Sequence, residues 1–291
     1  MKIESSTITS YLRRIKSDKF LLSGCAILFF FICLGIFGPI IAPYDPWYVC
    51  RDENGEVIFL TPPNYKNLLG TTSMGRDVFS QLLCGARTAL LVGFAAAFVV
   101  VFIGANIGLL AGYYGGPIDA FLMRLTDVVY SIPFEPFVIV LVAFLNPSIW
   151  NLIFALSLLM WRAPARVIRS AVLSLAKRPF VKAAKVAGAS DIRIIYLHIA
   201  PNILPIVLLY LATNVAWAIT AEAGLSFLGL GDPNLVSWGR MLNTVYTVGA
   251  VRIAWWWLWP PGISIILVTA SIYLISHAFE KMANPKLLRG R

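Results

Sequence analysis

Charged side chains are scarce in this sequence. Of its 291 residues only 13% are charged and 59% are hydrophobic, and the mean hydropathy is +0.78. Soluble globular domains have about 25% charged residues, so these values argue against a water-soluble enzyme. They also exclude intrinsic disorder, which requires few hydrophobic residues and a high net charge.

Motifs for catalysis, nucleotide binding and metal binding are missing as well. The chain has no GxxxxGK[ST] phosphate loop, so we do not expect it to hydrolyse ATP by itself. Ser226 lacks the GxSxG spacing of a nucleophile elbow. The two histidines, His198 and His277, are far apart with no HExxH motif, and no CxxC or Cys/His cluster exists. We therefore expect a non-catalytic chain that binds no cofactor or metal.

Cysteine is also rare, with four in the whole chain. Cys25 and Cys33 lie in the first apolar run, while Cys50 and Cys84 flank the polar stretch that follows it. A Cys50–Cys84 disulfide is compatible with an oxidising compartment, and two free thiols are an equal alternative.

Five long stretches carry no charged side chain: 20–44, 88–118, 136–161, 194–221 and 253–279. Each can cross a membrane, which takes about 20 helical residues. A sixth, less apolar span contains Arg124, Asp127 and Glu135. Backbone groups in lipid must be hydrogen-bonded within the segment, so we expect an all-α integral membrane protein. Its six transmembrane helices are predicted near 20–42, 88–113, 121–145, 149–172, 202–225 and 258–280.

The distribution of basic residues predicts the orientation. Most of the 24 lysines and arginines lie in residues 1–19, in the connection around 162–193 and in the C-terminal tail. By the positive-inside rule these segments, and with them both termini, are cytoplasmic. We therefore expect a multi-pass protein of the plasma or inner membrane, in contact with lipid. The net charge of +10 reflects topology, and no soluble basic face points to nucleic acid.

Residues 43–86 and 226–257 are then expected outside the cell membrane. Within the first of them, 48–50 and 57–59 flank an Asn-Gly turn and predict a small β-hairpin. Tryptophans are expected at the outer membrane surface, where indole rings favour the headgroup level. These are Trp47, Trp150, Trp255, Trp256, Trp257 and Trp259.

A stripe of small residues predicts close helix packing. Gly104, Gly108 and Gly112 are four residues apart, so they share one helix face that another backbone can approach. Contact within the chain is the main interpretation, and contact with a second membrane subunit is the alternative.

Charges near the membrane suggest two further interactions. Arg162, Arg166 and Arg169 share one helix face and are expected to reach anionic lipid headgroups, with partner binding as the alternative. Arg124 and Asp127 are three residues apart and are expected to form a pair within their helix.

The connection at 178–196 is the most informative part of the sequence. We expect a short helix with a small-residue face, a break at Gly188, and a second helix that is capped by Ser190 or Asp191 and ends before Pro201. Two such helices form a compact knob that a partner can approach and that passes movement to both adjoining spans. An amphipathic loop resting on the membrane is the alternative.

These residues carry a resemblance to a known family. Ala183-Ala184, Gly188 and Pro201 have the spacing of the EAA loop of ABC-importer permeases, the segment that docks on the ATPase subunit. Further segments resemble the C-type subunit of dipeptide/oligopeptide permeases. They are Ala42-Pro43-Tyr44-Asp45-Pro46, Leu69-Gly70-Thr71, Gly75-Arg76-Asp77, Gly85-Ala86-Arg87, 111–116, 123–127, 222–231 and Asn284-Pro285-Lys286.

The resemblance implies a type I ABC-importer permease fold with a cytoplasmic coupling helix. Residues 1–86 would form the N-terminal cytoplasmic segment, the first span and an extracytoplasmic loop, and residues 87–291 a five-helix core with the coupling loop at about 178–196. The family loop usually opens with Glu, but this chain has Lys182, so a salt bridge at that position is not expected. The coupling residues implied are Ala183, Ala184, Gly188, Ala189, Ser190 and Asp191.

The resemblance also implies partners and a function. The partners are a homologous B-type permease subunit, two ATPase subunits or domains that hold ATP and Mg²⁺, and an extracytoplasmic solute-binding protein. The expected function is import of dipeptides and oligopeptides. Oligosaccharides or nickel are alternative solutes for the same architecture.

Three polar residues within the spans are candidates for the solute pathway: Glu135, Asn214 and Glu222. Hydrogen bonding between helices is an equal explanation for them. An ion-coupled secondary transporter would also explain such residues, but it predicts inverted repeats, which the sequence does not show. A membrane-embedded enzyme would need a nucleophile and a base on facing spans, for which the chain offers few candidates.

Overall fold

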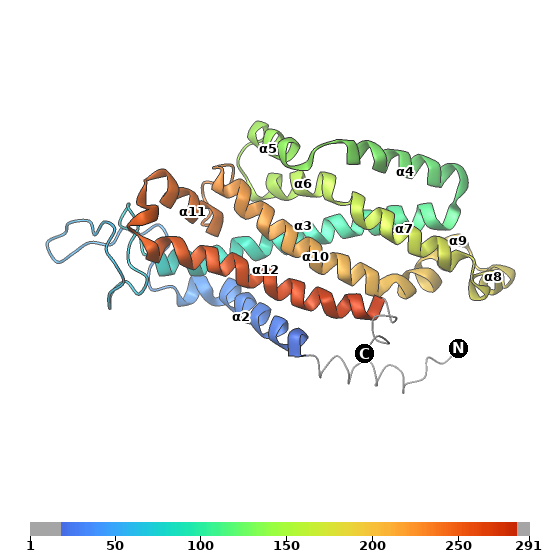
Figure 1. Cartoon of the computed structure of the whole chain (residues 1–291), viewed down its shortest axis with the longest axis horizontal. Coiled ribbons are helices and arrows are strands. Elements are labelled where there is room, and N and C mark those ends of the chain that lie inside the picture. Colours follow the sequence, from blue (N-terminus) through green and yellow to red (C-terminus); the bar gives the residue numbers. More distant parts are fainter. Residues whose placement is uncertain (1–18, 284–291) are drawn as a thin grey trace.

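Long helices lie roughly along one axis of the protein and form an elongated bundle (Figure 1). The computed structural model describes residues 19–283, so the basic N-terminal segment and Asn284-Pro285-Lys286 lie outside the described residues. In chain order the helices are α2 (Lys19–Ile41), α3 (Val78–Tyr114), α4 (Gly116–Ser131), α5 (Phe134–Phe144), α6 (Ile149–Met160), α7 (Arg162–Ala176), α8 (Pro179–Val186), α9 (Asp191–Arg193), the π-helical η1 (Ile194–Ile199), α10 (Ala200–Phe227), α11 (Trp238–Thr247), the 3₁₀ turn η2 (Ala250–Arg252) and α12 (Trp255–Ala283).

Four helical stretches are long and apolar enough to cross a membrane: α2, α3, α9 to α10 taken as one, and α12. Two further spans are bent pairs, α4 with α5 at 82° and α6 with α7 at 42°. With each pair taken as one span, the all-α fold with six spans is confirmed.

Two of the six predicted spans, 121–145 and 149–172, each consist of two helices joined at a bend. Between α4 and α5, Ile132 is extended (φ −84°, ψ 121°) and Pro133 follows it. A residue before proline avoids the helical region, and proline has no amide hydrogen for the helix ladder. Pro164 lies in the first turn of α7, close to the second bend, and it too lacks an amide hydrogen for the helix ladder. Both prolines are visible in the sequence, but the size of each bend depends on the neighbouring helices.

Helix α3 begins earlier than expected, at Val78, and therefore crosses the division at residue 86 that the sequence suggested. Asp77 caps it by accepting a hydrogen bond from the Ser80 amide at 2.7 Å. The Asp77 side chain also accepts from Asn67 Nδ2 at 2.9 Å. Asp77 therefore connects the preceding loop to the first turn of α3.

The glycine stripe of α3 packs against α7. A Cβ at Gly104 would lie 2.7 Å from the Trp161 carbonyl oxygen, and one at Gly112 would lie 2.7 Å from Val172 Cβ. Gly108 meets the same helix between them. The stripe therefore makes an intramolecular contact, as its main interpretation predicted.

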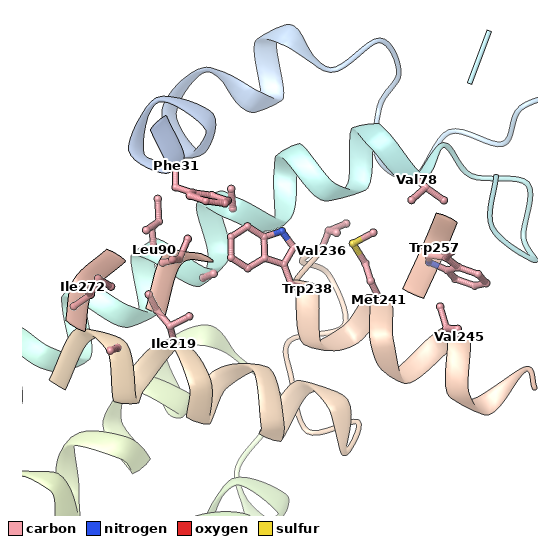
Figure 2. Close-up of a cluster of buried hydrophobic side chains, with 14 of the residues drawn as sticks. Phe31, Val78, Leu90, Ile219, Val236, Trp238, Met241, Val245, Trp257 and Ile272 are labelled. Carbon is pink, nitrogen blue, oxygen red and sulfur yellow. The ribbon is translucent and has the colours of Figure 1, made fainter. Parts of the chain in front are cut away.

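The hydrophobic core between α2, α3, α10, α11 and α12 is built around Trp238 (Figure 2). Trp238 is 1% exposed, and its indole nitrogen donates to the Leu82 carbonyl at 3.0 Å. The ring meets Phe31 of α2 edge-on at 5.7 Å between centroids. Gly85 leaves room for it, since a Cβ there would lie 2.7 Å from Trp238 Cδ1.

The loop before α3 contains the predicted hairpin pairing. Arg51 and Val57 form an antiparallel bridge, and the Ile58 amide donates to the Cys50 carbonyl at 3.1 Å. Gly55 closes the turn with a φ of +83°. The paired segments form isolated bridges, and residues 19–283 contain no named strand.

Two tryptophans differ from the expected membrane-surface position. Trp256 is 5% exposed and donates to the Thr71 carbonyl at 3.3 Å, and Trp257 is 1% exposed. Both pack in the core described above, Trp256 against the loop before α3 and Trp257 between Val78 and Val245 (Figure 2). Trp150, Trp255 and Trp259 are exposed and remain compatible with the interface.

The Cys50–Cys84 disulfide, one of two alternatives from the sequence, is not formed. Both thiols are free. Cys50 is buried in the loop, where its sulfur accepts from Asn67 Nδ2 at 3.5 Å, while Cys84 is on α3 beside the hydrophobic core. Burial raises the pKa of the Cys50 thiol above its usual value, with a further rise from the Asp77 charge and an opposing effect of Asn67.

We expect thiol labelling to show both cysteines in the reduced form. In a chain with Cys25→Ala and Cys33→Ala, an alkylating reagent should modify Cys50 and Cys84 in denaturant without any reductant. In the native protein, Cys50 should react slowly and reach its maximal rate at a higher pH than an exposed thiol, because the thiolate is the reactive form. Peptide mass mapping measures this, and modification that appears only after reduction would contradict it.

Candidate functional site

The segment 178–196 folds into the bent knob that the sequence predicts, at the end of the bundle opposite to the loop before α3 (Figure 1). Helix α8 ends in a Schellman motif: the Ala189 amide donates to the Ala184 carbonyl and the Gly188 amide to the Lys185 carbonyl, both at 3.1 Å. Gly188 has a φ of +80°, which L side chains rarely adopt. The break therefore depends on glycine at this position.

The second half of the knob differs from its prediction. Ser190 caps α9 by accepting from the Arg193 amide at 3.4 Å, as expected. The helix then continues through η1 into α10 and past Pro201, where an end was expected. The wide π-helical turn lies directly before this proline, which has no amide hydrogen of its own to donate. The second half of the knob is thus one helical stretch with the fifth span, Asp191–Phe227.

One side of the knob is buried and the other is exposed to solvent. Val181, Ile194 and Ile195 are at most 4% exposed and pack with side chains of α3 and α7. Val186 and Ile192, in contrast, are 90% and 69% exposed. The predicted coupling residues Ala183, Gly188 and Ser190 are exposed too, and Ala184, Ala189 and Asp191 are half-buried. An apolar exposed face with a buried anchor suits contact with a partner.

Two hydrogen bonds tie the knob to α3. Tyr113 Oη donates to Asp191 Oδ1 at 2.6 Å. Tyr196 Oη donates to Asn106 Oδ1 at the same distance. The partners are 78 and 90 residues apart in sequence, so no local pattern predicts these links. They give the knob a polar connection to the second span in addition to its covalent continuity with the fifth.

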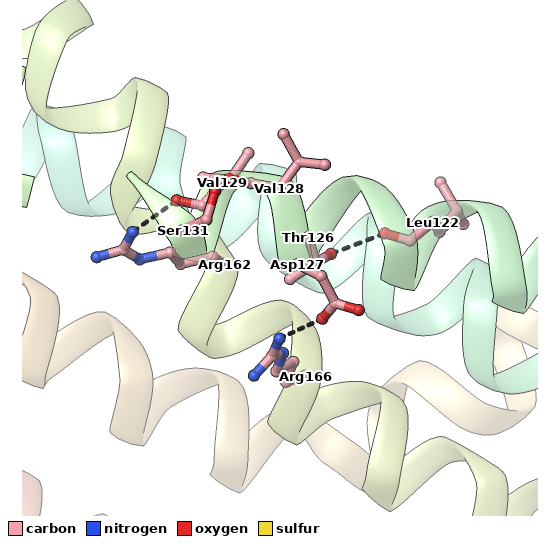
Figure 3. Close-up of polar contacts among 8 residues, drawn as sticks. All are labelled: Leu122, Thr126, Asp127, Val128, Val129, Ser131, Arg162 and Arg166. Carbon is pink, nitrogen blue, oxygen red and sulfur yellow. Dashed lines mark hydrogen bonds and ion pairs between the residues drawn. The ribbon is translucent and has the colours of Figure 1, made fainter. Parts of the chain in front are cut away.

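Arginines of α7 contact α4 and the residue that follows it, as Figure 3 shows for Arg162 and Arg166. Arg162 donates to the carbonyl oxygens of Val129 at 2.8 Å and Ile132 at 3.2 Å, where α4 ends. Arg166 pairs with Asp127. Both guanidinium groups also lie over the Tyr130 ring, at 4.7 and 4.0 Å.

The prediction of an Arg124–Asp127 pair is therefore wrong, and the arginines of α7 have protein partners that the sequence did not predict. Asp127 pairs with Arg166 of α7 and not with Arg124 of its own helix, and Arg169 pairs with Asp119. The reason is that α7 lies beside α4, so each of these arginines meets a carboxylate or a carbonyl of that segment. A sequence pattern shows the row but not the helix that it faces.

The three pathway candidates are not brought together. Glu135 is exposed and lines a cavity of about 520 Å³ with Trp217, Thr220 and Tyr273. Asn214 Nδ2 donates to the Tyr210 carbonyl of its own helix at 2.7 Å.

Glu222 is 2% exposed and lines a different cavity of about 10 Å³. Its Oε1 accepts from Ser226 Oγ at 2.7 Å, while Oε2 has no partner among the described residues. Of the three candidates, Glu135 alone lines the larger cavity.

Comparison with protein families identifies two matching regions. Residues 104–289 match the family described as the inner membrane component of binding-protein-dependent transport systems. Residues 7–63 match the N-terminal transmembrane domain of oligopeptide transport permease C. Together they cover most of the chain.

Curated relatives agree with this assignment. The chain is 35% identical to the dipeptide transport system permease protein DppC of Bacillus subtilis (strain 168), over 95% of this chain and 85% of the relative. It is 31% identical to the di/tripeptide transport system permease protein DppC of Pseudomonas aeruginosa (strain UCBPP-PA14), over 97% and 93% of the two chains. The oligopeptide transport system permease protein OppC of Bacillus subtilis (strain 168) is 31% identical over 94% and 88%.

A solved structure supports the fold. The chain matches one chain of the MetNI methionine ABC transporter in an inward-facing conformation with a TM-score of 0.55 and 17% identity, over 70% of this chain and 95% of that one. The predicted permease fold is thereby confirmed. With the family matches, it follows that this multi-pass membrane protein belongs to the family of inner membrane components of binding-protein-dependent transport systems.

Proposed function

We propose that the chain is the C-type permease subunit of an ATP-driven importer that carries dipeptides and oligopeptides across the cell membrane. The names of its relatives support this solute class. The observation that carries the proposal is the knob at 178–196, whose exposed apolar face has no partner within residues 19–283 although its base is fully packed.

In this proposal the knob is the handle that couples the chain to ATPase subunits. ATP binding draws two ATPases together, and their surfaces pull the knob at Ala183, Ala184 and Gly188. Because the knob continues into α10 and is hydrogen-bonded to α3, the two spans would move with it as one body. ATP and solute must each prefer one of the two states, since a ligand with equal affinity for both shifts nothing.

The remaining components are assigned by the same proposal. A homologous B-type permease completes the pathway, two ATPase subunits hold ATP and Mg²⁺, and an extracytoplasmic binding protein delivers the solute. This chain itself is non-catalytic and binds no cofactor. The knob and both termini face the cytoplasm, which places the loop before α3 and α11 outside. Lys182 leaves the knob without the usual opening carboxylate of this family.

The cavity beside Glu135 is the best candidate for this chain's half of the solute pathway. It lies among residues of α5, α6, α10 and α12, is lined mostly by apolar side chains and has one carboxylate. Such a cavity would accept varied peptide side chains without binding any of them tightly, while Glu135 attracts the peptide amino group.

Reconstitution tests this function. With the B-type permease, the ATPases and the binding protein in liposomes, uptake of a labelled dipeptide should require ATP and should stop when the ATPases are omitted. An excess of unlabelled peptide should compete, and oligosaccharide or nickel should not. Uptake that follows an ion gradient without ATPases would support a secondary transporter and overturn the proposal.

A further inference from the structure

A positively charged cavity lies at the end of the bundle opposite to the knob, between the loop before α3 and α11. It encloses about 180 Å³ and is lined by Trp47, Thr72, Met74, Arg76, Gln81, Val236, Ser237, Arg240, Met241 and Thr244. Two of these residues are arginines and none is acidic. The cavity shares no lining residue with the one beside Glu135, so it is separate from the proposed pathway.

Both guanidinium groups are held against the same indole ring. Arg76 Cζ lies 4.7 Å from the centroid of the Trp47 ring, and Arg240 Cζ lies 5.2 Å from it. Within residues 19–283 neither arginine forms an ion pair. Two cations therefore lie against one ring, and neither is ion-paired to a carboxylate of the described residues.

The spare hydrogen-bonding capacity of this cavity belongs to the arginines. Arg76 Nε is buried without a partner in the described part of the chain. Arg240 uses one terminal nitrogen for the carbonyls of Asp232, Pro233 and Leu235. A buried donor without an acceptor is costly, so the cavity is incomplete as it stands.

The hydroxyl oxygens and the amide nitrogen around the arginines already make hydrogen bonds. Thr72 Oγ1 accepts from the Arg76 amide at 3.0 Å, and Ser237 Oγ accepts from the Arg240 amide at 3.2 Å. Gln81 Nε2 donates to the Pro46 carbonyl at 3.0 Å. The charged groups that a ligand entering the cavity would meet are guanidinium N–H donors, for which a carboxylate is the matching acceptor.

The electrostatics of Arg240 favour an anion beside it. Burial lowers the pKa of the Arg240 guanidinium below its usual value, and the neighbouring Arg76 cation lowers it further, while Asp232 opposes the change. An entering carboxylate would offset the repulsion between the two cations and give the buried guanidinium groups an acceptor.

The rim of the cavity has the composition of a protein interface. Met74, which lines it, is 50% exposed, and Tyr48 and Tyr246 on the adjoining segments are 51% and 66% exposed. Aromatic residues, methionine and arginine are enriched at protein interfaces. We propose that an Asp or Glu side chain of the extracytoplasmic solute-binding protein inserts between Arg76 and Arg240 when that protein docks. This inference rests on the proposed function, which supplies the binding protein and the orientation.

The test measures binding of the purified, peptide-loaded solute-binding protein to the complete importer in lipid nanodiscs. Arg76→Gln should weaken binding about tenfold or more, as expected for loss of one charged contact at an interface centre. Arg76→Lys should restore part of the affinity, because it keeps the charge but not the paired N–H donors. Arg240→Glu should abolish binding, and an Asp/Glu→Arg change at one site of the binding protein should recover it.

Arg252→Gln is the matched control. It removes one positive charge from the same end of the protein at an exposed position outside the cavity, and should leave affinity unchanged. Arg240 also donates to loop carbonyls, so its replacement could lower stability, and the thermal midpoint of each variant is therefore measured. The Arg76 guanidinium donates to no described residue, so the Arg76→Gln result decides whether the docking site is correct.

The possible outcomes separate this inference from the proposed function. If the wild-type importer binds its binding protein and Arg76→Gln binds equally well, the docking site is wrong while the function stands. If binding is normal but uptake falls only for peptides with a free carboxyl terminus, the cavity takes the solute's carboxylate, which also overturns the docking site. If the wild-type importer fails to bind or to respond to any binding protein, the proposed function itself fails.

Discussion

Gly108→Val should prevent stable folding of the bundle. A Cβ at Gly108 would already lie 2.7 Å from the Ala165 carbonyl oxygen and 2.9 Å from the Arg169 amide nitrogen. These are backbone atoms of α7, which cannot rotate away as a side chain can. The two methyl groups of valine would force α3 and α7 apart, at a cost of about 3 kcal/mol, the upper end of the usual cost of overpacking.

The effect should extend beyond the contact itself. The same helix α7 carries Arg166 and Arg169, whose ion pairs with Asp127 and Asp119 hold α4. Separation of α7 from α3 would therefore displace α4 as well. Thermal unfolding in detergent and the yield of monodisperse protein measure this loss, and both should fall sharply.

Gly262→Val is the control for this experiment. Gly262 is also helical, in α12, but a Cβ there meets nothing within 4 Å. This variant should unfold at nearly the wild-type temperature. Equal stability of Gly108→Val and wild type would show that α3 and α7 are not packed as described.

Gly188→Val should uncouple ATP hydrolysis from uptake while the bundle stays folded. Gly188 has a φ of +80° but open space around it, so valine adds strain without a clash. Such strain amounts to about 1–2 kcal/mol, which is enough to unwind the break between α8 and α9. The exposed face of the knob would then lose its shape. In proteoliposomes we expect about tenfold less peptide moved per ATP hydrolysed, since about 1.4 kcal/mol corresponds to a factor of ten.

Two further variants isolate the cause. Gly188→Asn should retain most coupling, because asparagine adopts left-handed backbone angles more readily than other L residues. Gly229→Val introduces similar strain at a φ of +84° in open space just after α10, at the far end from the knob, and should leave coupling unchanged. Normal coupling in Gly188→Val would mean that the shape of the knob is irrelevant to transport.

Much of the fold was predictable because it depends on composition. The absence of charge over 88–118 or 253–279 leaves a buried helix in lipid as the available structure, and α3 and α12 lie there. Gly188 in the middle of a polar connection likewise predicts a helix end, because the left-handed angle that it adopts follows from its own chemistry.

The parts that the sequence did not predict depend on contacts between distant segments. Trp256 and Trp257 follow the exposed Trp255 directly in sequence, yet both are buried. Trp256 packs against the loop before α3, and Trp257 lies between Val78 and Val245 (Figure 2). Asp127 has a suitable arginine in its own helix but pairs with Arg166 across to α7. In both cases the local sequence suggests one environment for the side chain, and contacts with a distant segment provide another.

In the candidate site, too, local features were predictable and contacts between distant segments were not. The knob and its break could be predicted, whereas its links through Tyr113 and Tyr196 could not, because nothing marks these tyrosines in the sequence. The paired arginines at the other end, Arg76 and Arg240, are separated by most of the chain and meet only when α11 packs beside the loop before α3.

The central claim, that ATPase subunits grip the knob, is tested most directly by photo-crosslinking in the assembled importer. A benzophenone amino acid at position 186, where the native valine is 90% exposed, should crosslink to an ATPase subunit, with a yield that changes on addition of ATP. The same group at position 248, which is also exposed but at the opposite end, should not. An importer that is active in uptake, yet gives no ATPase crosslink from position 186, would contradict the account.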